Sequence, residues 1–352
     1  MKKKVLVAMS GGVDSSVAAC LLKEKGYDVA GVTMCLGIKD SNSSKPRCCG
    51  TEAVEDAKKV ADAIGIPHYV LDFSKELEEK VIQGFICDYE KGRTPNPCVD
   101  CNRRIKFGSL LKKALAMNFD FLATGHYARI EKSRGKYLLK KAKDKQKDQS
   151  YFLYGIQKEA LPNILFPLGS LAKKEVRIIA KKKRLPVWQK AESQDICFIK
   201  GRSYHDFFLN RSEKPESGSI LNRERRLLGR HKGVPFYTVG QRHGMGIGAK
   251  GALYVVSIDT ERNEIIAGEK EDLKAKSLVA QDANFLIEVF SGNASAKIRY
   301  SGNEAKCSFF SRGKSIKVIF DEKQEAITPG QSVVLYKNDT VLGGGVIKES
   351  IR

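Results

Sequence analysis

The stretch of residues 5–16 joins a short apolar run to a turn rich in serine and glycine, and it constrains the fold more than any other part of the chain. Residues 5–9 have the continuous hydrophobic character of a strand buried on both faces of a parallel sheet. The apolar residues that follow recur with helical spacing, namely Val17, Ala18, Leu21 and Leu22. The stretch therefore predicts a strand, a loop and a helix in that order.

The turn between this strand and helix has the features of a phosphate-binding loop. Gly11 and Gly12 let the backbone approach a ligand closely. Ser10, Ser15 and Ser16 add hydroxyl groups beside the free amides of a helix N-terminus, where the helix dipole favours an anion. A capped turn without any ligand is the alternative, but the full Ser-Gly-Gly-Val-Asp-Ser-Ser sequence directly after a first strand favours a nucleotide.

The loop differs from the Walker P-loop, G-x-x-x-x-G-K-[ST], in its charged residues. No lysine follows the glycines, and Asp14 stands inside the loop. Because a carboxylate repels phosphate unless a cation lies between them, Asp14 predicts that Mg²⁺ binds together with ATP. The stretch resembles the pyrophosphate loop (PP-loop) of the ATP pyrophosphatases, which cleave ATP to AMP and pyrophosphate while adenylating a substrate.

The composition predicts a globular protein with a polyanionic partner. A chain of 352 residues with 42% hydrophobic content is expected to form two or three domains. No run approaches the ~20 apolar residues that span a bilayer, and no signal peptide precedes the first strand, so we expect a cytoplasmic protein without a membrane partner. Sixty-two basic and 41 acidic residues give a net charge of +21, concentrated in residues 140–147, 181–184 and 223–232. This excess favours RNA or DNA.

The order of elements predicts an α/β catalytic domain followed by two small, mainly β domains. Strands are expected at residues 28–34, 67–72 and 121–124, and they alternate with helices at 51–64, 77–91 and 107–117, which is typical of a doubly wound parallel sheet. From about Gly218 the chain is dense in glycine and short alternating segments. We therefore predict domains at residues 1–205, 206–274 and 275–352, the last a barrel of about six strands.

Three cysteines are candidates for chemistry. The chain has nine cysteines, and in a cytoplasmic protein they argue against a disulfide framework. Cys98 and Cys101 form a CxxC pair, which two prolines are expected to hold in a loop before the helix at 107–117, and Cys197 lies far away in sequence. Three cationic residues lie close to this pair in sequence, namely Arg103, Arg104 and Lys106. Their charges should lower the pKa of the thiols and make the thiols nucleophilic. A structural zinc half-site or inert loop cysteines are the alternatives.

Six motifs together extend the resemblance from the superfamily to one family. They span nearly the whole chain, in the order residues 10–16, 96–97 with 101–107, 124–127, 147–152, 193–197, and 237–242 with 244–248. This set is similar to that of the bacterial tRNA-specific 2-thiouridylases, the MnmA/TrmU family. The resemblance implies an adenine nucleotide alpha hydrolase-like fold and an enzyme that adenylates the 2-oxygen of the wobble uridine of tRNA. Sulfur carried as a cysteine persulfide then replaces the activated oxygen.

The resemblance also implies roles for individual positions. The ATP site would comprise Ala8, Met9, Ser10, Gly11, Gly12, Val13, Asp14, Ser15, Met34 and Gly125. Cys101 would be the nucleophile and Cys197 the persulfide carrier. The target base would lie among Asn96, Pro97 and Cys98, and further tRNA contacts would come from His126, Lys147, Asp148, Gln149, Arg299, Tyr300 and Gln331. A separate protein would donate the sulfur, and we expect the chain to be a monomer.

Cys98 departs from the family pattern, in which an aspartate occupies this position. A third thiol in the site allows another hypothesis, in which Cys98, Cys101 and Cys197 hold an iron–sulfur cluster with one open iron. The persulfide route without a cluster is favoured. Two rival functions remain at this stage: another PP-loop adenylating enzyme, such as a 4-thiouridine synthase, and a non-catalytic basic RNA-binding module. Asp14 and the distant thiols argue against the second rival.

Overall fold

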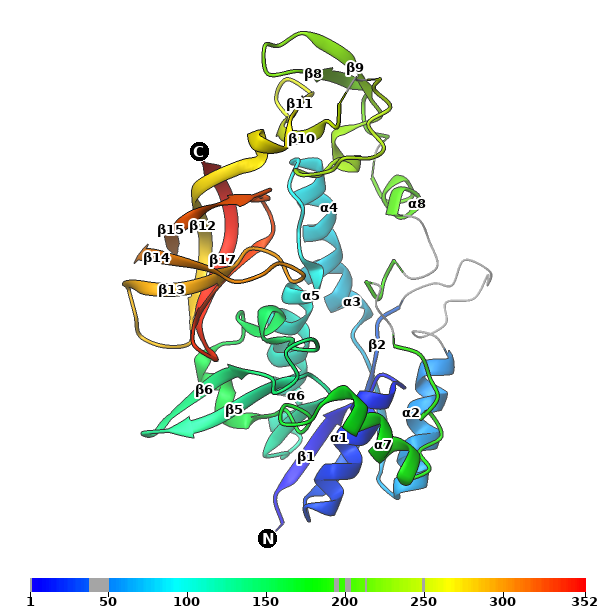
Figure 1. Cartoon of the computed structure of the whole chain (residues 1–352). Coiled ribbons are helices and arrows are strands. Elements are labelled where there is room, and N and C mark those ends of the chain that lie inside the picture. Colours follow the sequence, from blue (N-terminus) through cyan, green and yellow to red (C-terminus); the bar gives the residue numbers. More distant parts are fainter. Residues whose placement is uncertain (1, 38–50, 193–195, 200–203, 213, 249–250) are drawn as a thin grey trace. The chain divides into compact units, whose positions relative to one another are not determined.

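A computed structural model describes residues 2–37, 51–192, 196–199, 204–212, 214–248 and 251–352 (Figure 1). The chain divides into two compact units. Unit 1 comprises residues 1–81, 98–201 and 339–341, and unit 2 comprises residues 82–97, 202–338 and 342–352. In the described part of the chain, no helix is both long and apolar enough to cross a membrane.

A five-stranded parallel sheet forms the centre of unit 1. Its strands are β1 (Lys4–Ala8), β2 (Asp28–Cys35), β3 (His68–Asp72), β4 (Phe121–Thr124) and β7 (Ile164–Leu165). They lie in the order β3-β2-β1-β4-β7, so the strand order reverses between β1 and β4. Ala8 and Thr124 are paired at the carboxyl ends of these two strands. In doubly wound folds, this reversal marks the crevice where ligands bind.

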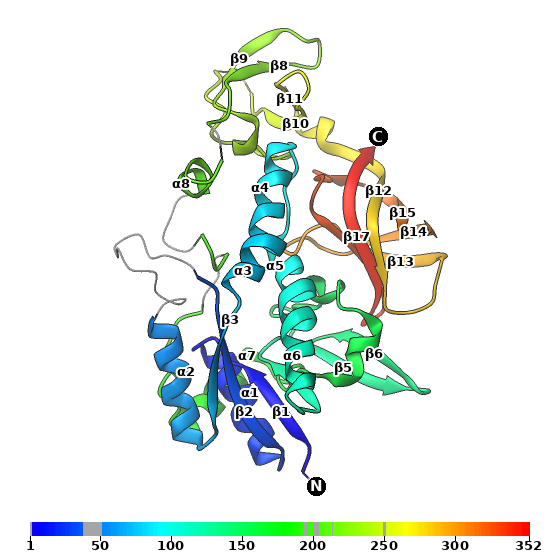
Figure 2. The same ribbon diagram turned by 180° about the vertical axis from the view of Figure 1, so that it is seen from behind.

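Helices cover both faces of the sheet, as Figures 1 and 2 show from opposite sides. On one face, Val5 and Val7 pack in a single buried cluster with side chains of α1 (Val13–Glu24), α2 (Thr51–Ile64) and α7 (Lys173–Lys182). The intervening Leu6 is fully buried on the other face, where β4 contacts α6 (Leu111–Ala116). The first strand is thus apolar on both faces, as predicted, because both faces are covered.

The helical segment that carries the CxxC pair begins earlier than predicted. α5 (Pro97–Asp100) leads directly into a π-helical stretch, Cys101–Leu110, and then into α6. Cys98 and Cys101 therefore lie in the first turns of a helix, and the prediction of a loop up to residue 107 was wrong. Proline is tolerated at the first helical position, where its missing N–H has no partner to lose, so Pro97 begins this helix instead of preventing it.

Other segments of unit 1 are short. α3 (Ser74–Leu77) is followed by a π-helical turn, Glu78–Ile82, whose last residue belongs to unit 2. β5 (Ala128–Ser133) and β6 (Lys136–Lys141) form an antiparallel hairpin that was not predicted. Lys140 of this hairpin pairs with Thr340. Two 3₁₀ segments follow, Ser150–Leu153 and Lys158–Asn163.

Unit 2 contains a small four-stranded sheet with its own core. Its strands are β8 (Gly218–Leu221), β9 (Leu227–His231), β10 (Tyr254–Asp259) and β11 (Glu264–Gly268), in the order β10-β11-β8-β9. β8 and β11 run parallel, and the other neighbours run antiparallel. The short helix α8 (Tyr204–Leu209) precedes this sheet, and 3₁₀ turns occur at Val234–Phe236 and Lys270–Leu273.

The C-terminal part of unit 2 is a closed barrel of six strands. They are β12 (Lys274–Phe285), β13 (Ser291–Lys297), β14 (Ala305–Arg312), β15 (Ser315–Glu325), β16 (Ser332–Lys337) and β17 (Thr340–Ile351). The order is β12-β15-β14-β13-β16-β17, and pairing of β12 with β17 closes the circle. Alternate residues such as Cys307, Phe309 and Ser311 of β14 point into the barrel. The predicted fold class, a parallel α/β domain followed by mainly β domains, is confirmed.

One segment from the first part of the sequence packs within unit 2. It consists of α4 (Gln83–Glu90) and the turn that follows. The ring of Phe85 lies 6.1 Å from that of Tyr204, measured between centroids. The Thr94 amide donates a hydrogen bond of 2.8 Å to the carbonyl of Pro329, and its carbonyl accepts one of 2.8 Å from Nε2 of Gln331. The segment thereby contacts both α8, which precedes the small sheet, and the turn between β15 and β16 of the barrel.

Candidate functional site

The loop after β1 and the turn after β4 meet at the point where the strand order reverses. Gly125 directly follows β4, and a Cβ added there would lie 2.7 Å from the backbone nitrogen of Ser15. The turn after β4 therefore lies against the N-terminus of α1, and any side chain at Gly125 would force the two apart. The sequence placed both segments in the ATP site, and the fold brings them together.

The loop itself is held by hydrogen bonds among its own residues. The Ser10 amide donates to Oγ of Ser15 at 3.2 Å, and Oγ of Ser16 donates to the Gly12 carbonyl at 2.8 Å. Gly11 has a φ of +69°, and a Cβ there would lie 2.4 Å from the carbonyl oxygen of Ala53, so only glycine fits.

The start of α1 is suited to an anion. Gly12 is its N-cap and supplies no side chain to satisfy the first amides. A Cβ built at Gly12 would meet only Oγ of Ser10, at 3.5 Å, so the space beside the helix start is open. The residues present therefore fit the phosphates of ATP.

Asp14, in the first turn of α1, is paired with a lysine from another helix. Nζ of Lys173 donates to Oδ1 and Oδ2 of Asp14 at 2.6 and 2.8 Å, and the hydroxyl of Tyr127 donates to Oδ1 at 2.9 Å. Burial and the charge of Asp14 raise the pKa of Tyr127, so this hydroxyl stays protonated. A carboxylate is the right ligand class for Mg²⁺. No sequence motif pointed to Lys173, which lies 159 positions from Asp14.

A second carboxylate connects Lys173 to the predicted tRNA-contacting stretch. Oε1 of Glu192 lies 3.3 Å from Nζ of Lys173, and Oε2 lies 2.7 Å from Nζ of Lys147. Hydrogen bonding to Lys147 and the charge of Lys173 lower the pKa of Glu192 against a desolvation effect, so this carboxylate is ionised at neutral pH. Gln149 accepts a 2.9 Å hydrogen bond from the Tyr127 amide. Residues predicted to touch tRNA thus adjoin the phosphate loop.

The other predicted residues of this region have structural contacts of their own. Asp148 accepts a hydrogen bond of 2.9 Å from the Ala142 amide and supports the turn that carries Lys147. Met34 is half-buried near the end of β2, while Met9 is buried, with its amide bonded to the Val32 carbonyl at 2.8 Å. Ala8 and Val13 form the end of β1 and the start of α1.

His126 lies against two aromatic rings. Its ring centroid is 5.9 Å from that of Phe107 and 6.0 Å from that of Phe166. Its Nδ1 shares a 2.7 Å hydrogen bond with the hydroxyl of Thr124. Desolvation and the charge of Lys106 hold the pKa of His126 well below 6.5, so the imidazole is neutral at pH 7. Any contact of His126 with tRNA would therefore be made by an uncharged ring.

The CxxC thiols are less acidic than the sequence suggested. Cys101 is half-buried, and desolvation raises its pKa above the ordinary 9.0 despite the opposing charge of Lys106. The pKa of Cys98 is raised for the same reason, although the exposure of this side chain weakens the effect. Our expectation that nearby cations would lower these pKa values was wrong. Arg104 is occupied by Asp100, with Nε 3.2 Å from Oδ1, so its charge is largely compensated.

This difference predicts slow alkylation of Cys101 at neutral pH. Because only the thiolate reacts, the rate with iodoacetamide should rise about tenfold per pH unit up to at least pH 9. Mass spectrometry of the peptide that contains Cys101 measures this alkylation rate, and a small free thiol serves as the reference. A rate that already levels off near pH 7 would show that the resting thiol is ionised and would contradict this reading.

Among the described residues, the predicted thiols are not part of any metal-binding group. Cys197 is exposed. In the parts of the chain that the structure describes, no group of three Cys, His, Asp or Glu side chains is placed to hold a metal ion. Cys35 is disulfide-bonded. Residues 193–195 of the Cys197 motif lie outside the described residues, as do Cys48 and Cys49.

The remaining predicted tRNA residues belong to unit 2. Gln331 contacts the carbonyls of Thr94 and Pro95, directly before Asn96 and Pro97, so the barrel helps to shape the predicted base-binding turn. Arg299 donates to the Glu325 carbonyl at 3.4 Å. Tyr300 is 37% exposed, with Nζ of Lys297 lying 5.7 Å from its ring centroid.

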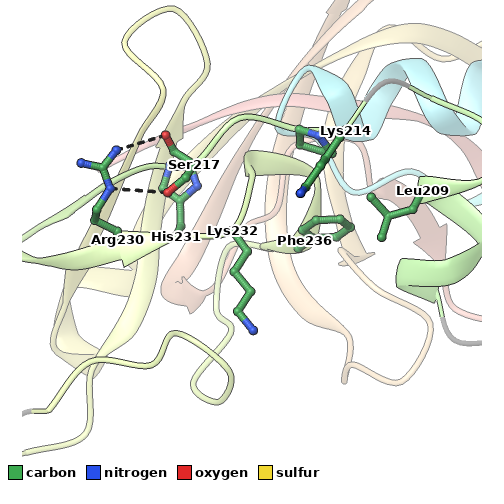
Figure 3. A pocket seen from close by; sticks show the side chains of 8 residues that line it. Leu209, Lys214, Ser217, Arg230, His231, Lys232 and Phe236 are labelled. Carbon is green, nitrogen blue, oxygen red and sulfur yellow. Dashed lines mark hydrogen bonds between the residues drawn. The ribbon is translucent and has the colours of Figure 1, made fainter.

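Unit 2 also contains a basic cavity of about 470 Å³ (Figure 3). Figure 3 shows Arg230 hydrogen-bonded to Ser217, with Lys214 and Lys232 on the lining beside Phe236. His231 lines it too, but both of its ring nitrogens are already occupied, by the Asn263 carbonyl and the Gly233 amide. The positive charge of the cavity therefore comes from the two lysines and the arginine.

Three family models match consecutive parts of the chain. The model described as a tRNA methyl transferase HUP domain matches residues 3–201. The tRNA methyl transferase PRC-barrel domain matches residues 206–269, and the aminomethyltransferase beta-barrel domain matches residues 275–347.

Relatives match over nearly the full length. The chain is 54% identical to the tRNA-specific 2-thiouridylase MnmA 1 of Syntrophus aciditrophicus, over 100% of this chain and 94% of the relative. It is 49% identical to the tRNA-specific 2-thiouridylase MnmA of Moorella thermoacetica, over 97% and 99% of the two chains. A solved 4-thiouridine synthetase–RNA complex with bound ATP is 17% identical, with a TM-score of 0.36 over 59% of this chain and 49% of the other. The match of the HUP-domain model and the identities of 54% and 49% over nearly the full length show that the chain belongs to the MnmA family of tRNA-specific 2-thiouridylases.

Proposed function

We propose that this protein is a tRNA 2-thiouridylase, which adenylates the 2-oxygen of the wobble uridine with ATP and then replaces that oxygen by sulfur. The observation that supports it most is the PP-loop with Asp14 at the reversal of strand order, in a chain 54% identical to a 2-thiouridylase over its full length. ATP would be cleaved to AMP and pyrophosphate. A separate persulfide-carrying protein would supply the sulfur. The enzyme itself would act as a monomer.

The loop would hold the phosphates while the uridine oxygen attacks. The amides at the start of α1 and the hydroxyls of Ser10 and Ser15 would donate hydrogen bonds to the phosphate oxygens. Asp14 would hold Mg²⁺, which when bound offsets negative charge on the leaving pyrophosphate. The adenylate group makes the uridine oxygen a good leaving group, which an unactivated carbonyl oxygen is not.

The thiols would then deliver sulfur. The terminal sulfur of a persulfide on Cys197 attacks C2 of the uridine, and the C2–O bond breaks as AMP leaves. The Cys101 thiolate next attacks the Cys197 sulfur that is bonded to this atom, so the sulfur–sulfur bond breaks and its electron pair stays with the 2-thiouridine. A Cys101–Cys197 disulfide forms, and a dithiol reductant restores both thiols. The raised pKa of Cys101 means that its proton must be removed during the cycle.

The deciding experiment is a reconstitution with defined components. The purified protein is incubated with unmodified tRNA, Mg-ATP and a persulfide donor, and nuclease digests are searched for 2-thiouridine, aerobically and anaerobically. We expect 2-thiouridine and pyrophosphate in equal amounts under both conditions. Formation of 4-thiouridine would favour a different PP-loop enzyme, and activity only after anaerobic iron loading would favour the iron–sulfur alternative. RNA binding without pyrophosphate release would leave only an RNA-binding module.

Binding of tRNA should weaken steeply as salt is added. Each phosphate that a lysine or arginine neutralises releases counterions and contributes about 0.7–0.9 to the slope of log Kd against log salt concentration. Replacing Lys214, Arg230 and Lys232 of the basic cavity together by alanine should lower that slope by about one for each lost phosphate contact. Filter binding across a salt series measures it. Lys75→Ala, which removes an exposed lysine elsewhere, is the control, and equal slopes for both variants would exclude the cavity from tRNA binding.

A further inference from the structure

Lys106 is a half-buried lysine to which the described residues supply no carboxylate partner. Arg104, two positions earlier in the same helix, is by contrast paired with Asp100, with 3.2 Å between Nε and Oδ1. Burial of an ammonium group is costly unless a counterion accompanies it. An unpaired lysine at such a place is therefore suited to an anion that arrives with a substrate.

The form of the helix brings Lys106 to the side that carries Cys101. Residues Cys101–Leu110 are π-helical, and the hydrogen bonds of a π-helix join residues five positions apart, so such residues lie one above the other. In an α-helix, positions five apart are rotated from each other by about 140°. The charge of Lys106 accordingly acts on the thiols of both Cys98 and Cys101.

The next residue of the helix packs against the turn after β4. The ring centroid of Phe107 lies 5.9 Å from that of His126, and the charge of Lys106 acts on His126 too. His126 directly follows Gly125, where a Cβ would lie 2.7 Å from the backbone nitrogen of Ser15. This stretch of helix thus adjoins both the thiols and the turn beside the phosphate loop.

The proposed reaction brings an anion to this part of the molecule. Once the uridine is adenylated, the phosphate of AMP is joined to C2 through a single oxygen. Because the persulfide attacks C2, this phosphate lies close to the thiols during sulfur transfer. When the C2–O bond breaks, its electron pair passes to AMP, whose phosphate gains negative charge.

We propose that Lys106 is a catalytic residue of the sulfur-transfer step, which donates a hydrogen bond to the adenylate phosphate on the uridine and stabilises AMP as it leaves. The proposal rests on the proposed function, because it adds a residue to the same reaction. A cation placed where negative charge develops stabilises the transition state more than the ground state. Pyrophosphate leaves before this step, so its release should not depend on Lys106.

The test separates the two half-reactions in single turnovers. Wild type and Lys106→Met are mixed with unmodified tRNA and Mg-ATP radiolabelled at the α-phosphate, and a persulfide donor is then added. Pyrophosphate release by Lys106→Met should stay close to the wild-type rate. Formation of 2-thiouridine should be roughly 10²–10³-fold slower, as for the loss of a donor to a developing anion, and labelled adenylated tRNA should accumulate.

Two further variants show whether the charge itself is responsible. Lys106→Arg keeps a cation and should recover most of the lost rate. Lys112→Met is the matched control, because Lys112 is an exposed lysine of α6, which continues the same helix. It should thiolate tRNA at the wild-type rate. Methionine retains the unbranched, apolar stem at position 106, and thermal unfolding shows whether each variant is folded.

Three outcomes would overturn the inference. An unchanged rate of 2-thiouridine formation in Lys106→Met would leave the lysine without a catalytic role. Weaker tRNA binding by this variant before ATP is added would mean that the anion is a backbone phosphate of the tRNA. Slower alkylation of Cys101, without accumulation of adenylated tRNA, would mean that the lysine acts on the thiolate. Each of these leaves the proposed function intact, which only a wild type without pyrophosphate release and 2-thiouridine would refute.

Discussion

Cys101→Ser and Cys197→Ser should each abolish formation of 2-thiouridine, while Cys98→Ser should retain substantial activity. In the persulfide route Cys197 carries the sulfur and Cys101 releases it, so loss of either thiol removes a covalent step and is expected to lower the rate by more than about 10³-fold. Cys98 has no covalent task in that route. Nuclease digestion and mass spectrometry of the tRNA measure all three variants, with the exposed Cys87→Ser as the control.

The same variants separate the two sulfur mechanisms. If a cluster were bound, each of the three thiolates would hold an iron, and Cys98→Ser would be as damaging as the other two. The persulfide route further predicts a Cys101–Cys197 disulfide after one turnover without reductant, which requires their Cα atoms to come within ~7 Å. Absorbance at about 400 nm in anaerobically prepared protein, lost together with activity in Cys98→Ser, would instead support the cluster.

Asp14→Ala should nearly abolish Mg²⁺-dependent pyrophosphate release and leave tRNA affinity almost unchanged. Without this carboxylate the metal loses its expected protein ligand, and a loss of several kcal/mol of charge stabilisation corresponds to at least about 10³-fold in rate. The affinity for tRNA comes from the basic surface, which the substitution does not touch. Pyrophosphate release and filter binding are measured on the same preparation.

Asp56→Ala provides the matched control for this prediction. Asp56 also pairs with a lysine in unit 1, but the pair is formed with Lys190 and does not involve the phosphate loop. It should keep the wild-type rate. An unchanged rate in Asp14→Ala would mean that this carboxylate does not take part in ATP cleavage, and the assignment of the loop would have to be withdrawn.

The sequence was most informative where function depends on local order along the chain. The phosphate loop, the buried first strand and the acidic residue Asp14 are all encoded within residues 5–16, and the structure has the predicted strand, loop and helix there. α2 and β4 have the predicted bounds. Hydrophobic periodicity identifies such elements because each one buries a face of its own.

The parts that were missed depend on contacts distant in sequence or on solvent exclusion. Lys173 is one of 62 basic residues, and only the fold brings it to Asp14. The thiol of Cys101 was expected to be acidic because its cationic neighbours are visible in the sequence, whereas the burial that outweighs them is not. Pro97 was interpreted as a helix breaker, but it is the first residue of a helix, where proline is tolerated. The sequence alone does not show where the preceding turn ends, and so it does not show that the helix begins at Pro97.

The packing of residues 82–97 within unit 2 has a consequence for domain shuffling. Exchanging residues 206–352 between two relatives by a single crossover would pair Phe85 of one parent with Phe207 of the other, and Thr94 of one parent with Pro329 of the other. A viable chimera is therefore expected to inherit residues 82–97 and the following domains from one parent, through three crossovers instead of one. The unit that can be exchanged therefore consists of two segments that are separated in the gene.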